Sequence, residues 1–128
     1  MIYLDSSVAL SALFTELHSP PLHFWSQHLV SSRLLEYEIT NRVYMRIPGA
    51  ANLDAAQTLL KSVTLLDMTP GILARALKPF PIALRTLDGL HRATMDFLRA
   101  QGQTLQLASY DRRFVAAAEA LGFSAVAI

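Results

Sequence analysis

Short apolar runs alternate with longer helical patterns along nearly the whole chain, and this alternation is the strongest constraint on its fold. The runs predict strands at residues 1–4, 29–31, 63–68, 104–108 and 125–128. Helical patterns fill the intervals between them, and connections of this kind join parallel strands through helices. We therefore expect an α/β fold, a three-layer sandwich in which a mostly parallel sheet lies between helices.

The helical stretches have recognisable start and stop signals, which place them between the expected strands. They cover residues 8–14, 20–28, 32–47, 52–61, 70–77, 88–100 and 112–121. Pro48 and Gly49 are expected to end the third of them. With 128 residues and no linker or low-complexity segment, the chain is expected to form one domain over residues 1–128.

Composition excludes several classes of site. There is no cysteine, which excludes disulfides and thiolate metal ligands. No apolar stretch approaches the roughly 20 residues that span a bilayer, and no signal peptide is recognisable, so we expect a cytoplasmic protein with no membrane association. Hydrophobic residues make up 52% and charged residues only 16%, which favours burial of some apolar surface against another chain, with burial in the helices of this chain as the alternative.

Three acids follow expected strands or open expected helices. Asp5 ends the first apolar run, Asp88 opens a helix, and Asp111 follows the fourth run. Each position alone favours helix N-capping over metal binding. Because parallel strands bring their carboxyl ends to one edge of a sheet, all three acids are nevertheless expected at the same edge, where they could share one pocket.

Glu38 lies inside an expected helix, where capping does not account for it. The core stripe of that helix is Leu35, Ile39 and Val43, and Glu38 flanks this stripe. A surface ion pair with Arg42, one turn later, is the structural alternative. We expect Glu38 to join the three aspartates.

Four carboxylates in one pocket would repel one another strongly without a cation. Two of them about 4 Å apart repel by about 4 kcal/mol at an effective dielectric of about 20. Carboxylate ligands suit Mg²⁺ or Mn²⁺, and the four histidines are not spaced for zinc. Metal-assisted phosphodiester cleavage is therefore the leading hypothesis, with one or two ions that orient a water for in-line attack.

Two serines and a histidine lie close to these acids in the sequence. Ser6 follows Asp5, and Ser109 precedes Asp111 by two positions, so either hydroxyl could steady a carboxylate or a water. His91, one turn beyond Asp88, could touch substrate or steady Asp88. A half-buried histidine whose hydrogen bonds are satisfied within the protein is the more common case.

At these residues the sequence resembles the PIN-domain family, and within it the VapC-type toxins of bacterial toxin–antitoxin pairs. The resemblance covers nearly the whole chain and depends on the order and spacing of four segments. They are residues 2–7 (Ile-Tyr-Leu-Asp-Ser-Ser), residues 31–34 leading into Glu38, residues 84–91 (Leu-Arg-Thr-Leu-Asp-Gly-Leu-His), and residues 109–113 with the Ala-rich helix that follows.

The resemblance implies a parallel sheet between helices and an Mg²⁺- or Mn²⁺-dependent endoribonuclease site. Its catalytic and metal-binding acids would be Asp5, Glu38, Asp88 and Asp111. It also implies cleavage of tRNA or ribosomal RNA, dimerisation, and inhibition by a cognate antitoxin. Gly89 stands where Ala is common and Ser109 where Thr is common, but neither departure removes an acid, so an active enzyme is expected.

Arginine outnumbers lysine nine to two, and Arg suits phosphate and base contacts. A GC-rich genome is the alternative explanation of this bias. The candidates for guiding the RNA backbone are Arg85, Arg92, Arg112 and Arg113.

Apolar residues near the N-terminus are expected to form part of an antitoxin groove, with a place in the core as the alternative. They are Phe14, Leu22, Phe24 and Trp25. Two other functions share the overall pattern: a non-catalytic binding domain in which the acids only cap helices, and an RNA-processing PIN nuclease outside a toxin–antitoxin pair. Metal-dependent RNA cleavage would distinguish the nuclease from the non-catalytic binding domain. The identity of the neighbouring gene would distinguish a toxin from an RNA-processing nuclease.

Overall fold

The computed structural model describes residues 1–15, 18–46 and 50–128 of the chain. These residues form a five-stranded sheet in which every neighbouring pair of strands is parallel, with the order β3-β2-β1-β4-β5. The strands are β1 (Ile2–Leu4), β2 (Leu29–Ser32), β3 (Val63–Leu66), β4 (Gln106–Ala108) and β5 (Ser124–Ala125).

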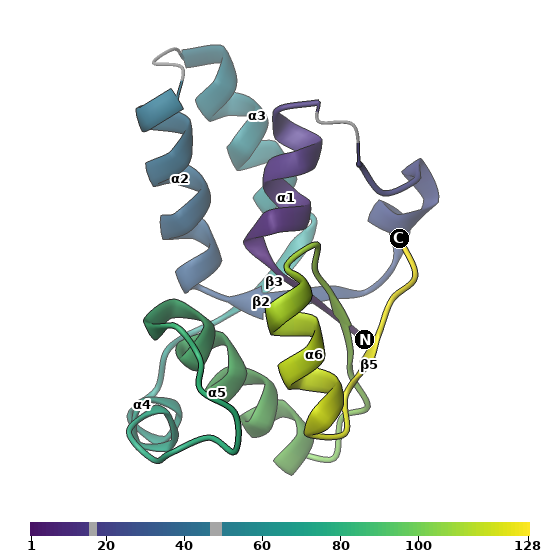
Figure 1. The fold of residues 1–128 in the computed structure, drawn as a ribbon. Coiled ribbons are helices and arrows are strands. Elements are labelled where there is room, and N and C mark those ends of the chain that lie inside the picture. The colour runs from purple at the N-terminus through teal and green to yellow at the C-terminus, as the bar shows by residue number, and fades with distance from the viewer. Residues whose placement is uncertain (16–17, 47–49) are drawn as a thin grey trace.

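Helices cover both faces of this sheet (Figure 1). One layer contains α1 (Ser6–Leu13), α2 (Leu34–Arg46) and α3 (Ala50–Leu60), and the other contains α4 (Pro70–Ala76), α5 (Thr86–Ala100) and α6 (Arg112–Ala120). The expected three-layer α/β sandwich is confirmed. Among the described residues, none of the helices combines the length and apolar character that crossing a bilayer requires.

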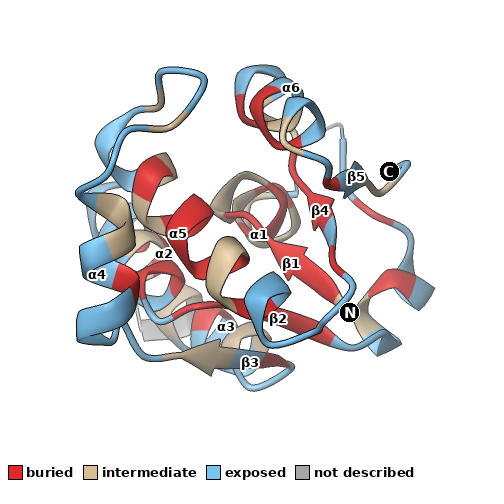
Figure 2. Ribbon diagram, turned by 90° about the horizontal axis from the view of Figure 1, so that it is seen from below, coloured by how far each residue is buried: buried red, intermediate tan, exposed pale blue. Residues whose placement is uncertain are grey.

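The alternation of side chains along β1 divides the core between the two layers. Ile2 and Leu4 pack in the cluster formed with α1, α2 and α3. Tyr3, between them, packs in the cluster formed with α5 and α6. Figure 2 shows the central strands buried and the outer surface of α4 exposed. Tyr3 is thus held in the middle of the molecule, under α5.

The strand order places a topological switch point between β1 and β4. The chain moves outward from β1 to β2 and β3, then returns to place β4 on the other side of β1. Leu4 pairs with Ala108 in the register of these two strands, so their carboxyl ends lie side by side. Crevices at such points are the usual ligand sites of open α/β sheets.

Several boundaries differ from expectation. The helix expected at residues 20–28 is the short 3₁₀ helix η1 (Leu22–Ser26), because Pro21 provides no side-chain cap and β2 begins only three residues after η1 ends. The terminal strand ends at Ala125 rather than at residue 128. The stop expected at Pro48 and Gly49 lies outside the described residues.

The four apolar residues proposed for an antitoxin groove do not form one surface. Phe24 is buried in the core, and Trp25 packs edge-on against it at 5.1 Å between ring centroids. Leu22 is 92% exposed, whereas Phe14 packs against the core cluster. Phe24 is therefore a core residue that anchors η1 to the sheet. The prediction that it lines an antitoxin groove was wrong. Trp25 instead lines a shallow apolar hollow between α1 and α3.

Candidate metal centre

Asp5 and Ser109 join the carboxyl ends of β1 and β4. The Asp5 backbone N–H donates to the Ala108 carbonyl at 3.0 Å, which extends the pairing of the two strands by one step. The Ser109 hydroxyl donates to Asp5 Oδ2 at 2.7 Å. Asp5 is 5% exposed, so its side chain is buried at the switch point.

Ser7 is a third residue at this junction, and the sequence analysis did not assign it to the site. Its hydroxyl donates to Asp5 Oδ2 at 2.6 Å and accepts the Tyr110 backbone N–H at 2.9 Å. Asp5 Oδ2 also caps α1 through the Ser7 backbone N–H. Every hydrogen bond that the Asp5 carboxylate accepts goes to Oδ2, and within the described residues Oδ1 has no hydrogen-bond donor.

Asp111 combines the capping role expected of it with a position beside Asp5. Its Oδ1 accepts the backbone N–H groups of Arg113 and Phe114 at the start of α6. Its own N–H donates to the Ser109 hydroxyl at 3.0 Å, and that hydroxyl in turn donates to Asp5. In the described part of the chain, Asp111 Oδ2 has no donor.

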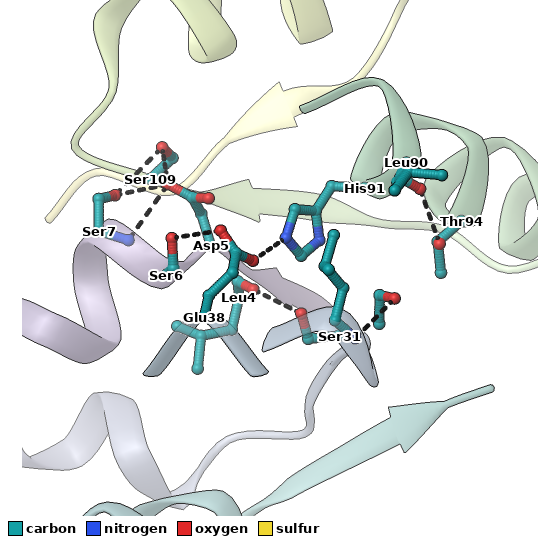
Figure 3. A network of polar contacts seen from close by, with 12 residues as sticks. Leu4, Asp5, Ser6, Ser7, Ser31, Glu38, Leu90, His91, Thr94 and Ser109 are labelled. Carbon is teal, nitrogen blue, oxygen red and sulfur yellow. Dashed lines mark hydrogen bonds and ion pairs between the residues drawn. The ribbon is translucent and has the colours of Figure 1, made fainter. Parts of the chain in front are cut away.

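Glu38 approaches the same edge from α2. Its Oε2 accepts the Ser6 hydroxyl at 3.2 Å, and its Oε1 lies 2.5 Å from His91 Nε2 (Figure 3). The surface ion pair with Arg42 does not form. Helical spacing placed Arg42 within reach of Glu38, but Glu38 turns toward the sheet while Arg42 remains exposed on α2.

Asp88 lies in the first turn of α5 and caps nothing. The helix begins two residues before Asp88, with Arg85 at the N-cap position, so the N-cap role considered for Asp88 is wrong. Within residues 1–15, 18–46 and 50–128, no group donates a hydrogen bond to its half-buried carboxylate. The positive end of the α5 dipole favours a carboxylate in this position.

The other three acids lie close enough to Asp88 to raise its pKa. Burial raises this pKa most, and the Asp5, Asp111 and Glu38 carboxylates raise it further. His91 acts in the opposite direction. Acids from α2, α5 and the ends of β1 and β4 therefore share one region of negative potential.

The donor chemistry of this region fits a hard divalent cation. Across the described residues, no Lys or Arg forms an ion pair with any of the four acids. Asp88 is unsatisfied, and Asp5 and Asp111 each keep one oxygen without a donor. No three His, Asp or Glu side chains among the described residues converge closely enough to form a ready-made metal site. An all-oxygen set of this kind suits Mg²⁺ or Mn²⁺.

Two hollows flank the acids and contain exposed cationic or aromatic side chains. The first lies beside Asp88 and is also lined by Arg85 and Arg113. The second lies beside Glu38 and is lined by Tyr37, Asn41 and Arg42, among others. The second group was not predicted from the sequence, because nothing in the spacing of an exposed Tyr and Arg on α2 distinguishes them from ordinary surface residues.

Arg92 must be removed from the residues proposed to guide RNA. Its side chain is only 2% exposed and donates to Asp96 Oδ1 through Nε and Nη2, at 3.2 and 3.0 Å. The guanidinium also lies 4.6 Å from the centre of the Phe123 ring. A side chain held in this way inside the α5 and α6 layer cannot contact a macromolecule. Arg85, Arg112 and Arg113 are exposed.

Gly89 follows Asp88 and stands where Ala is common in the PIN-domain family. It does not interrupt α5, which is helical from Thr86 to Ala100. A Cβ at this position would meet its nearest neighbour, in the Phe80 ring, at 3.7 Å, an ordinary contact. Gly89→Ala is therefore expected to raise the free energy of unfolding by about 0.5–1 kcal/mol, because it reduces the entropy of the unfolded chain. Urea denaturation measures the change.

Gly102→Ala is the matched comparison. Gly102 has a φ of 85°, and no atom lies within 4 Å of a Cβ built there, so only backbone strain opposes the substitution. We expect this variant to lose about 1–2 kcal/mol. A loss of stability in Gly89→Ala would show that the first turn of α5 is strained at Asp88.

The family model of the PIN domain matches residues 2–120. The chain is also 29% identical over 132 aligned residues to Ribonuclease VapC35 of Mycobacterium tuberculosis, in the strains CDC 1551 / Oshkosh and ATCC 25618 / H37Rv, covering 99% of this chain and 96% of the relative. Ribonuclease VapC47 of the CDC 1551 / Oshkosh strain is 25% identical over 130 residues, covering 96% and 93%. The chain belongs to the PIN-domain family.

Proposed function

We propose that this chain is a divalent-metal-dependent endoribonuclease of the VapC type. The observation that carries the proposal is the gathering of Asp5, Glu38, Asp88 and Asp111 near the switch point, with no Lys or Arg paired to them in the described residues. The two relatives named ribonucleases match nearly the whole chain, which supports the same assignment.

Helix capping does not explain this arrangement. It accounts for one oxygen of Asp5 and one of Asp111. It leaves Glu38 and Asp88 unexplained, since neither lies at a helix end that it caps. A non-catalytic domain would gain nothing from an Asp88 carboxylate that is half-buried, surrounded by like charges and without a donor, because such a group destabilises the fold.

The acids would hold Mg²⁺ or Mn²⁺ through the oxygens that the protein leaves free. When bound, such an ion stabilises charge on phosphoryl oxygens and lowers the pKa of a water nucleophile. Arg85 and Arg113 would bind backbone phosphates beside Asp88, and Arg112 would extend this surface along α6. On the other flank, Tyr37 and Arg42 would contact the neighbouring nucleotide by stacking and charge.

RNA cleavage in the presence and absence of metal tests the proposal. We expect cleavage of a tRNA or ribosomal RNA pool with Mn²⁺ or Mg²⁺, and none with EDTA. Asp5→Asn should reduce the rate by about 1,000-fold, since it removes a negative ligand without changing the shape of the site. The control is Asp54→Asn, an exposed acid on α3 that should leave the rate unchanged. Equal rates in the two variants would refute the proposal.

As a VapC-type protein, the chain would also bind a cognate antitoxin and form a homodimer. The apolar hollow between α1 and α3 that Trp25 lines would receive an apolar antitoxin segment. Co-expression with the product of the adjacent gene should yield a complex without RNA cleavage. Cleavage that persists at full strength beside that product would favour an RNA-processing PIN nuclease that acts outside a toxin–antitoxin pair.

A further inference from the structure

A chain of buried hydrogen bonds connects the middle strand of the sheet to Glu38. Tyr3 on β1 and His91 on α5 are both completely buried. Tyr3 Oη accepts the Ser32 backbone N–H at 3.1 Å and lies 2.7 Å from His91 Nδ1. The other ring nitrogen, Nε2, lies 2.5 Å from Glu38 Oε1 (Figure 3). The chain therefore runs from the β2 backbone through Tyr3 and His91 to Glu38.

The partners at each end determine the direction of these bonds. The Tyr3 hydroxyl already accepts a backbone N–H, and its single hydrogen can be donated to Nδ1. An imidazole that accepts at Nδ1 carries its hydrogen on Nε2 and donates it to the Glu38 carboxylate. In this arrangement Nε2 of His91 is the donor to Glu38.

The same contacts exclude His91 as a residue that exchanges protons with substrate. Both ring nitrogens are occupied, and none of the ring is accessible from the site. The ring plane is also fixed by edge-on packing against Tyr3, with 5.7 Å between centroids and 80° between planes. What His91 can do is hold Glu38 in one orientation, together with Ser6, which donates to the other carboxylate oxygen.

We propose that Tyr3 and His91 are positioning residues that orient the Glu38 carboxylate for cation binding. This inference depends on the proposed function, because it assigns Glu38 to the metal-binding set. A carboxylate keeps further lone pairs after accepting one hydrogen bond at each oxygen. Glu38 can therefore bind a cation while Ser6 and His91 hold it, and no reorganisation of its long side chain is needed at the moment of binding.

Two substitutions at His91 separate positioning from packing. His91→Leu fills the space but has no N–H, and we expect Mn²⁺ affinity to fall by about 10–100-fold. His91→Gln can place an amide N–H close to the position of Nε2–H, and its affinity should return to within about threefold of the unsubstituted protein. Isothermal titration calorimetry with Mn²⁺ alone on the full chain measures both. A role in packing only would give the two variants the same affinity.

Tyr3→Phe tests the remote end of the chain and keeps the buried ring. It removes the donor to Nδ1, so we expect Mn²⁺ affinity to fall by about tenfold, although Tyr3 does not touch Glu38. Ser11→Ala is the matched control, because it deletes a hydroxyl that is almost equally buried and that donates to the Val8 carbonyl on α1. It should leave the affinity unchanged.

Nitrogen NMR of the metal-free protein gives a readout that does not depend on catalysis. The unsubstituted protein should show a hydrogen on Nε2 of His91, where the Glu38 carboxylate accepts it, and Tyr3→Phe should change the Nδ1 resonance because that nitrogen loses its partner. The absence of a hydrogen on Nε2 of His91 in the unsubstituted protein would overturn the inference. So would unchanged Mn²⁺ affinity in folded His91→Leu and Tyr3→Phe variants, while the unsubstituted protein binds Mn²⁺ and cleaves RNA. Failure of the unsubstituted protein to bind Mn²⁺ would instead overturn the proposed function, and this inference with it.

Discussion

Asp88→Asn is expected to make the metal-free protein more stable at pH 7 while it reduces RNA cleavage by about 1,000-fold. The gain in stability arises because Asp88 is half-buried among the Asp5, Asp111 and Glu38 carboxylates and has no hydrogen-bond donor in the described residues. Asn has nearly the same shape and no charge. We expect its thermal unfolding midpoint to rise by a few degrees.

The gain in stability of Asp88→Asn depends on pH. The pKa of Asp88 is raised in the folded protein, chiefly by burial, so ionisation of Asp88 costs the folded state free energy. This cost is absent below about pH 4, where the carboxyl is protonated in both states, and it is complete above the raised folded pKa. The difference in midpoint between Asp88→Asn and the unsubstituted protein should therefore disappear in acid.

Added metal should reverse the order of stability. A cation that binds only the folded state stabilises it in proportion to the logarithm of its concentration. Saturating Mn²⁺ is expected to raise the midpoint of the unsubstituted protein above that of Asp88→Asn, which has lost a ligand. Thermal scans with Mn²⁺ and with EDTA measure this crossover, and Asp54→Asn is the control. Identical responses to Mn²⁺ in the two proteins would remove Asp88 from the metal-binding set.

Asp96→Ala is expected to lower the free energy of unfolding by about 3–5 kcal/mol, the largest stability loss predicted for a residue outside the metal centre. Asp96 is the partner of the buried Arg92 and also contacts Arg75 and Arg99, so it joins α4 to α5. Without Asp96, the Arg92 guanidinium is left inside the protein with no carboxylate. Its Nη1 already has no hydrogen-bond partner among the described residues.

A surface ion pair provides the comparison for this substitution. Asp67 bonds to Arg33 at 2.7 Å, but both side chains are more than half exposed, so Asp67→Ala should cost less than about 1 kcal/mol. Adding Arg92→Met to Asp96→Ala should recover much of the loss, since the buried charge is then removed together with its partner. Urea denaturation of all four proteins measures these differences. Equal losses in Asp67→Ala and Asp96→Ala would show that Arg92 finds water or another partner.

Local patterns in the sequence predicted the sheet, most of the helices and the edge at which the acids lie. Strand and helix periodicities act over a few residues, and Asp5 and Asp111 follow β1 and β4 so closely that their place is determined by the strands themselves. The exact start of α5 was missed by two residues, and for that reason Asp88 was taken for a cap.

Only the tertiary structure decided which partner each charged side chain takes. Glu38 had Arg42 within one helical turn, yet it bonds to His91, which is 53 positions away. Arg92 lies next to His91 in the sequence and was equally plausible as a surface residue, but it is buried with Asp96. A helical pattern shows which residues share a face, whereas packing of the layers determines what that face meets. Partner choice in the site therefore depends on contacts between α2, α5 and the sheet, which no local pattern contains.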